Sequence, residues 1–177
     1  GLILYPGACM LSENPLFAPV TDLETFGKLG DEGVLTMVGD STNVLKPCKS
    51  ESEADVRKGL TDLIMGLEGR IAVTCFASNV ARVESIAKAA QASGRVVMIV
   101  GRSLRNLETA ARECGYFQDL PPFLTEQDAR DVDDDSLLMI ITGSQGEPRS
   151  ALSRIASDTH PNIALGEGDT VIYSSRM

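Results

Sequence analysis

The chain has 177 residues, of which 43% are hydrophobic and 23% charged, values that suit one globular domain with a substantial core. No apolar run approaches the ~20 residues that span a bilayer, so we expect no membrane partner and a cytoplasmic location. The formal net charge of −9 argues against tight nucleic-acid binding by this chain alone, because such binding comes mainly from Lys and Arg side chains that neutralise phosphates.

The hydrophobic pattern predicts a strand at residues 2–5, then a short helix at 21–30 that Gly30 ends. Beyond it, buried strands alternate with amphipathic helices to the end of the chain. The expected strands cover residues 34–38, 70–76, 96–100, 136–141 and 170–173, and the expected helices begin near residues 50, 79, 102, 125 and 149.

Strands without polar alternation, each followed by a helix, are typical of a parallel sheet that is covered on both faces. The predicted fold class is therefore α/β, a Rossmann-like parallel sheet with helices on both faces. Such sheets bind ligands just outside the carboxyl ends of their strands. Small polar residues follow all five expected strands from residue 34 onward. Each group alone suits a helix cap, but five at one edge favour a shared polar site.

The junction at residues 70–82 is the clearest of these strand ends. Its apolar run stops at Ser78 and Asn79, either of which would cap the following helix. A helix N-terminus presents unpaired backbone N–H groups and the positive end of the helix dipole, so this junction is a candidate anion site.

Several catalytic schemes do not fit this sequence. It contains no dinucleotide-binding Gly-x-Gly-x-x-Gly after a strand, no P-loop and no Gly-x-Ser-x-Gly elbow. The single histidine, His160, excludes a cluster of His ligands and is expected to be a surface residue. Asp133, Asp134 and Asp135 are interpreted as a solvated acidic loop, so no metal site is expected here. The four cysteines lack the spacing of a zinc ribbon or a disulfide framework.

The strand-end motifs together resemble the β-CASP domain of ribonuclease J, a branch of the metallo-β-lactamase superfamily. Order and spacing agree from about residue 21 to the end, and the Gly-Ser-Gln-Gly-Glu-Pro block at 143–148 is the most specific piece. The resemblance implies that residues 1–20 are a remnant edge of the metallo-β-lactamase domain and a linker. Residues 21–177 would be the β-CASP domain, short of a closing segment. The matching segments are residues 39–43, 75–82, 100–103, 142–154 and 168–176.

The resemblance implies a parent protein that is a zinc-dependent exo- and endoribonuclease of RNA processing and decay. Its two zinc ions would lie in the metallo-β-lactamase domain of the same chain, around a His-x-His-x-Asp-His motif, with the β-CASP domain clamping RNA over them. The expected partner is 5′-monophosphorylated or single-stranded RNA, and a homo-oligomer remains open. This sequence lacks that motif, and Ala8 occupies the usual position of a ligand Asp. The fragment alone is therefore expected to bind no cofactor and to be inactive.

Site residues follow by matching positions. Asp40 would orient active-site groups in a supporting role, and Arg102 would pair with a phosphate. Phe76 would either stack on a base or close the core, while Arg82 is open between a phosphate contact and a surface cation. The residues expected to contact RNA or its phosphates are Ser41, Thr42, Asn43, Phe76, Ala77, Ser78, Asn79, Arg102, Ser103, Ser144, Gln145 and Gly146.

Two alternatives remain from the sequence. The acidic net charge favours a non-catalytic nucleotide-binding or oligomerisation module for the isolated chain. A DNA-processing β-CASP relative is the other, since β-CASP proteins divide between RNA and DNA substrates.

Overall fold

The computed structural model describes residues 1–7, 15–17, 19–41, 45, 47 and 51–175. The chain divides into two compact units, Gly1–Ala54 and Asp55–Met177. Ala8 and the predicted site residues Thr42 and Asn43 lie outside the described residues. No helix in the described part of the chain is long and apolar enough to cross a membrane.

The first unit is a small β-α-β arrangement. Strands β1 (Leu2–Gly7) and β2 (Val34–Gly39) pair in parallel, and helix α1 (Leu23–Glu32) connects them. Helix α1 begins after Asp22, whose carboxylate accepts a hydrogen bond from the Thr25 N–H at 2.9 Å. The prediction that Gly30 ends this helix is wrong, because the helix continues to Glu32. Gly33, whose φ is +91°, is the C-cap that follows it.

The strand predicted at residues 34–38 exists as β2, but it is not part of the sheet that the other strands form. Its hydrogen-bonded neighbour is β1, and the two make a separate two-stranded sheet. The sequence predicts five strand ends at one edge of a single sheet. This prediction is wrong for one of the five, the end of β2. The reason is a long-range pairing: after α1 the chain returns, and β2 forms hydrogen bonds with β1.

The second unit contains a four-stranded parallel sheet in the order β4-β5-β3-β6. This arrangement confirms the predicted α/β class with a parallel sheet and helices on both faces. Its elements are α2 (Glu53–Met65), most of which lies in this unit, β3 (Ile71–Thr74), α3 (Val80–Ala92), β4 (Val96–Val100), α4 (Arg102–Glu113), two 3-10 helices (Asp128–Asp131 and Asp134–Ser136), β5 (Leu137–Ile141), α5 (Ala151–Ala156) and β6 (Thr170–Tyr173).

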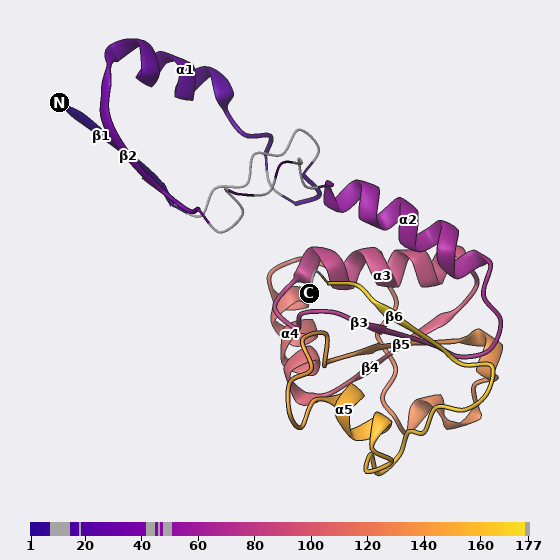
Figure 1. Cartoon of the computed structure of the whole chain (residues 1–177). Helices are drawn as coiled ribbons and strands as arrows, with labels where there is room; N and C mark the ends of the chain where they lie inside the picture. The colour runs from indigo at the N-terminus through magenta and orange to yellow at the C-terminus, as the bar shows by residue number, and fades with distance from the viewer. Residues whose placement is uncertain (8–14, 18, 42–44, 46, 48–50, 176–177) are drawn as a thin grey trace. The chain divides into compact units, whose positions relative to one another are not determined.

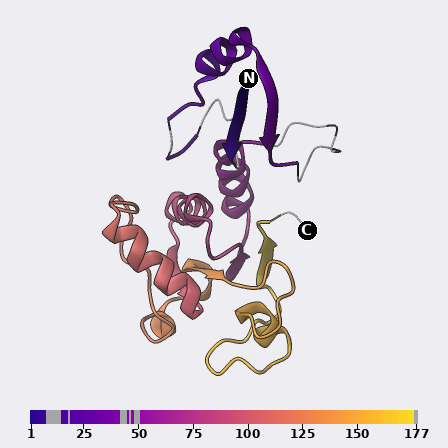
Figure 2. The same cartoon turned by 90° about the vertical axis from the view of Figure 1, so that its left-hand side faces the viewer.

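The two faces of this sheet are covered by different helices. Figures 1 and 2 show α3 on one side of the sheet and α5 on the other. After α4 the chain crosses the outer edge of β4, where Leu124 bridges to Met98. The Leu124 N–H donates to the Val97 carbonyl at 2.8 Å. The edge of β4 is thereby covered before the chain enters β5.

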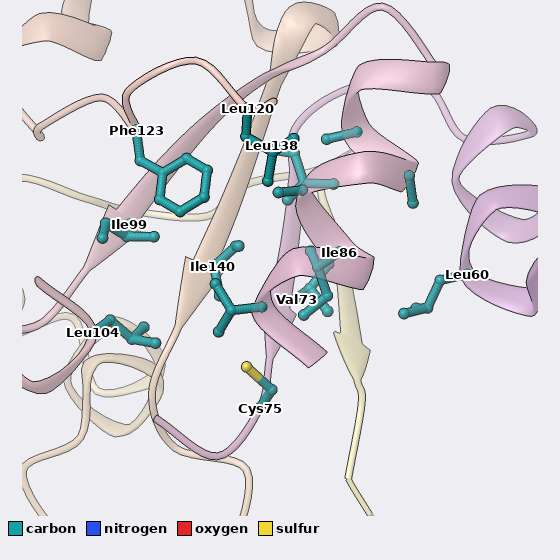
Figure 3. Packing of buried hydrophobic residues seen from close by; sticks show 14 of the residues in the cluster. Leu60, Val73, Cys75, Ile86, Ile99, Leu104, Leu120, Phe123, Leu138 and Ile140 are labelled. Atoms are coloured by element: carbon teal, nitrogen blue, oxygen red, sulfur yellow. The ribbon is translucent and has the colours of Figure 1, made fainter. Parts of the chain in front are cut away.

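Side chains alternate between two cores, as expected for strands buried on both faces. On β3, Ile71 and Val73 join the cluster beneath α3 and α4, whereas Ala72 joins the cluster beneath α5. All five residues of β5 are buried. Figure 3 shows Val73, Ile99 and Ile140, from three neighbouring strands, gathered in the first cluster.

A charged pair ties the start of β3 to the start of β6. Arg70 Nη2 lies 2.8 Å and Nε 3.2 Å from the two carboxylate oxygens of Asp169, whose side chain is 6% exposed. The same carboxylate accepts the backbone N–H groups of Arg70 and Gly166. Burial alone would raise the pKa of Asp169, but these hydrogen bonds and the Arg70 charge hold that pKa below its ordinary value.

We expect Asp169→Asn to lower the free energy of unfolding at pH 7 by about 2 kcal/mol, because charge-assisted hydrogen bonds are lost in a buried position. A depressed carboxyl pKa contributes stability above the unfolded-state value and loses it as the pH falls through the folded-state value. The difference between the two proteins should therefore shrink below about pH 4. Urea denaturation between pH 7 and pH 3 measures it. Glu167→Gln, on an exposed side chain of the same loop, is the control. A difference that stayed constant over this pH range would contradict the prediction.

Candidate functional site

The loops that follow β5, β3 and β6, three neighbouring strands of the main sheet, form a surface that we call the rim. The Ser174 N–H donates to the Thr74 carbonyl at 2.8 Å, so the chain after β6 stays alongside β3. Ser175 Oγ donates to the Ser144 carbonyl at 3.4 Å and lies 3.5 Å from Gln145 Nε2. The loops after β5 and β6 thus meet across the end of β3. The rim consists of residues 75–79, 142–146 and 174–175.

The start of α3 supplies the first polar part of the rim. Asn79 Oδ1 accepts the Arg82 N–H at 3.0 Å, which confirms that Asn79 caps this helix. Ser78, just before the cap, is exposed. The first turn of α3 has no acidic residue, so its positive dipole end is not offset by a carboxylate from that turn.

Two hydroxyl groups, one in the rim and one at the strand end just before it, are buried without a partner. Thr74 Oγ1 and Ser144 Oγ make no hydrogen bond, and both residues are 0% exposed. A buried unsatisfied hydroxyl costs about 1–3 kcal/mol, so a native protein that keeps one there commonly has a functional reason. These groups mark the ends of β3 and β5 as places where the fold itself leaves hydrogen-bonding capacity unused.

The backbone donors of the loop after β5 are largely used within the loop. The Gln145 N–H donates to the Glu147 carboxylate at 3.0 Å, and the Gly146 N–H donates to the Gly143 carbonyl at 3.2 Å. Any anion bound by these two N–H groups would first have to displace those acceptors. The side chain of Gln145, which points to Ser175 and the Ser144 carbonyl, is the more accessible donor.

Gly143 gives this loop its shape. Its φ is +122°, and an added Cβ would lie 2.7 Å from Leu152 Cβ and 2.7 Å from Ser150 Oγ. The Leu152 N–H donates to the Thr142 carbonyl at 3.0 Å, which pulls the start of α5 against the strand end. Only glycine combines this backbone conformation with so close an approach.

Arg82 has a role that the sequence left open. Its Nη1 donates to the Ser174 carbonyl at 2.6 Å and to Ser174 Oγ at 3.0 Å. The guanidinium therefore joins α3 to the end of β6, and it acts as a positioning residue of the rim. Helical periodicity alone could not reveal this contact, because the partner lies 92 residues further along.

Phe76 and Ala77 complete the loop after β3. The Phe76 side chain is 44% exposed, so it does not close the core, which was one of the two interpretations of this residue. Ala77 is half-buried and packs against the core cluster beneath α3. An exposed ring beside Ser78 leaves an aromatic face open to a base.

Arg102 and Ser103 lie in a different place, a hollow of about 950 Å³ that we call the basic groove. They begin α4, and the groove extends from there to α5 and to the loop after it. From the loop after β5, Thr142 and Arg149 line it. The groove is lined by Ile99, Gly101, Arg102, Ser103, Arg105, Asn106, Thr125, Glu126, Gln127, Thr142, Arg149, Ala151, Arg154, His160 and Asn162.

His160 lies half-buried in the wall of this surface groove, which is consistent with the predicted surface position. Its Nδ1 accepts the Asn162 N–H at 3.4 Å. Burial lowers the pKa of His160, Glu126 raises it and Arg154 lowers it, with a net result below the ordinary value of 6.5. A residue before a proline in an irregular loop carries no sequence signal for this position.

Asp40 and Ser41 follow β2 and belong to the other unit, Gly1–Ala54. Both are exposed. Because β2 is not a strand of the main sheet, the sheet itself does not join them to the rim, contrary to the expectation from the sequence.

Among the described residues, no three His, Cys, Asp or Glu side chains come together in a way that could hold a metal ion. These residues therefore do not fit a two-zinc centre, and no chemical step is assigned to a metal here.

The rim motifs match a known domain. A family model described as "Ribonuclease J, beta-CASP domain" matches residues 68–177. The chain belongs to this family. The resemblance inferred from the motifs is thereby confirmed. The rim and the groove lie wholly within the matched β-CASP residues, whereas Asp40 and Ser41 precede them.

Curated relatives match nearly the whole chain. Ribonuclease J of Sinorhizobium meliloti is 42% identical over 176 residues, which are 99% of this chain and 31% of that protein. Ribonuclease J of Mycolicibacterium smegmatis is 44% identical over 178 residues, covering 100% and 32%. Ribonuclease J of Thermus thermophilus is 37% identical over 175 residues, covering 99% and 30%. The chain spans about a third of the length of these relatives.

A pair of glycine substitutions tests whether close packing at Gly143 shapes the loop after β5. Gly143 and Gly146 both have positive φ, so alanine at either position costs about 1–2 kcal/mol. A Cβ at Gly143 also clashes, whereas one at Gly146 meets nothing within 4 Å. We expect Gly143→Ala to lower the free energy of unfolding by at least about 1 kcal/mol more than Gly146→Ala. Urea denaturation of both variants measures this, and equal losses would contradict it.

The single histidine permits a direct test of the groove. Its NMR titration should give a pKa below 6.5 for His160. Arg154→Gln should raise that pKa, because a repelling charge is removed, and Glu126→Gln should lower it, because an attracting charge is removed. A pKa insensitive to both substitutions would show that neither group acts on the imidazole.

Proposed function

We propose that this β-CASP domain holds single-stranded RNA within a parent protein that hydrolyses RNA phosphodiester bonds. The observation that carries the proposal is the rim, where polar groups from three strand ends meet and the Ser144 hydroxyl is buried without a partner. Family membership and the printed name of the relatives, ribonuclease J, supply the substrate class.

The rim suits phosphate and ribose in its chemistry. Ser78 and the capped start of α3 offer hydroxyl and dipole contacts to an anion. Ser144, Gln145 and Gly146 would form the opposite side, where the Ser144 hydroxyl and the Gln145 side-chain amide can bond ribose as well as phosphate. The backbone N–H groups of Gln145 and Gly146 would contribute only after releasing their partners within the loop. Phe76, with its exposed ring, would stack on a base.

The division of labour in the parent is part of the same proposal. Residues 1–20 would be an edge of the metallo-β-lactamase domain and a linker, and residues 21–177 the β-CASP domain. The two zinc ions would be held by the metallo-β-lactamase domain outside this chain, with Asp40 in a supporting role. This chain would contribute substrate binding, and by itself it would not cleave RNA. A cytoplasmic location belongs to the same proposal.

The alternative is a non-catalytic nucleotide-binding module, which the net charge of −9 favours for the isolated chain. The two differ in their response to length and salt. An RNA wall binds 5′-monophosphorylated RNA in a salt-sensitive way, whereas a nucleotide pocket binds a mononucleotide as tightly as an RNA.

Ser144→Ala separates a ligand-binding role from a structural one. The hydroxyl has no partner in the fold, so its removal should leave the free energy of unfolding unchanged or raise it by up to about 1 kcal/mol. The same substitution in the full-length protein should weaken binding of 5′-monophosphorylated RNA by about 3- to 10-fold, the value of one hydrogen bond.

Fluorescence anisotropy with labelled RNA and urea denaturation give the two readouts. Ser153→Ala, on the exposed face of α5, is the matched control and should change neither. A Ser144→Ala protein that is destabilised but binds RNA with unchanged affinity would contradict the proposed role. Metal-dependent RNA cleavage by the isolated chain, lost on Ser78→Ala, would contradict its lack of activity.

A further inference from the structure

The basic groove is a second polar surface of the domain, separate from the rim. It lies along the starts of α4 and α5, whereas the rim lies at the ends of β3, β5 and β6. The loop of residues 142–150 separates the two surfaces. Thr142 and Arg149, near the two ends of that loop, line the groove, while Ser144 and Gln145 between them contact Ser175.

The groove concentrates positive charge in an acidic chain. Four arginines line it, and Glu126 is the one carboxylate among its described lining residues. This gives a local formal charge of +3 where the chain as a whole carries −9. The Glu126 carboxylate is also engaged, since it accepts a hydrogen bond from Asn162 Nδ2 at 2.6 Å. An anion entering the groove therefore meets a positive potential.

Most of the described arginines elsewhere in this unit donate hydrogen bonds that stabilise the fold. Arg95 donates to the Leu67 and Gly69 carbonyls, and Arg112 donates to the Phe117 carbonyl and lies over the Phe123 ring. Within the groove, Arg105 likewise donates to the carbonyls of Ile99, Phe123 and Leu124.

The other three groove arginines differ. Among the described residues, Arg102, Arg149 and Arg154 have no hydrogen-bond or ion-pair partner for their guanidinium groups, and all three are exposed. Only one further described arginine, Arg130, shares this state, and it does not line the groove. Exposed guanidinium groups that line one hollow are suited to bidentate contacts with phosphate.

We propose that the basic groove binds the sugar–phosphate backbone of RNA at nucleotides beyond those held at the rim. This inference rests on the proposed function. The three guanidinium groups come from separate elements, the start of α4, the loop before α5 and the last turn of α5. Their spread over an open hollow of about 950 Å³ suits several successive phosphates better than one small anion. Thr142 belongs to both the rim and the groove lining, so the two surfaces adjoin at the end of β5.

The test uses the full-length protein with 5′-monophosphorylated RNA of 3 and of 20 nucleotides. The groove variant combines Arg102→Gln and Arg154→Gln. The control combines Arg130→Gln and Lys58→Gln, two exposed cations outside the groove, and so removes the same charge. Ser144→Ala serves as the rim variant. Affinities are measured by anisotropy at several salt concentrations, and thermal unfolding checks that each variant is folded.

The groove variant should weaken binding of the 20-mer roughly tenfold and make its log–log salt slope shallower by about 1.4, the value for two lost phosphate contacts on a single strand. Its affinity for the trinucleotide should be unchanged. The control should bind both RNAs like the unmodified protein, and the rim variant should weaken both.

Three results would overturn the inference. In the first, the groove variant binds the 20-mer with the affinity and salt slope of the unmodified protein, while Ser144→Ala weakens binding of the 20-mer. This result would contradict RNA binding by the groove and leave the proposed function intact. In the second, the unmodified full-length protein binds neither the 3-mer nor the 20-mer, which would contradict both the proposed function and the role of the groove. Binding of a polyglutamate peptide that the groove variant weakens, with 20-mer binding unchanged, would assign the groove to an acidic protein partner.

Discussion

The close packing of Gly143 against Ser150 and Leu152 is the constraint on which the functional surfaces depend. Because the residue has no Cβ and a φ of +122°, the chain can turn sharply from the end of β5 into α5. That turn carries Ser144 toward β6 on one side and brings Arg149 and Arg154 beside α4 on the other. The rim and the basic groove are thus two sides of one loop.

The location of the charged side chains in this domain matters more than the net charge of the chain. Several arginines bond carbonyl oxygens or carboxylates and stabilise the fold, as Arg70 does with Asp169 and Arg95 with Gly69. Others remain exposed beside the strand ends. A net charge of −9 is therefore compatible with a local surface that attracts phosphate, because the net charge is a sum over the whole chain.

The fold was largely predictable because its signals are local. Continuous apolar strands and helix-capping residues such as Asn79 located most elements within a few residues. The errors came from pairing and from loops. Residues 34–38 form a strand that pairs with β1 instead of the main sheet, a choice made by long-range contacts. Arg149 adopts a φ of +68° and stands outside the helix predicted to include it. His160 lines the groove, where the charges of Glu126 and Arg154 act on its pKa, and periodicity does not relate these residues to it.

The sequence by itself determined the α/β class, the family and the polar character of the strand ends, because each depends on residue order and short-range spacing. Only the tertiary structure decided which of those ends share a surface. It separated Arg102 from Ser144, left the Ser144 hydroxyl buried without a partner, and used Arg82 to hold Ser174. These outcomes depend on strand order and on contacts between residues far apart in the chain, which local sequence patterns do not encode.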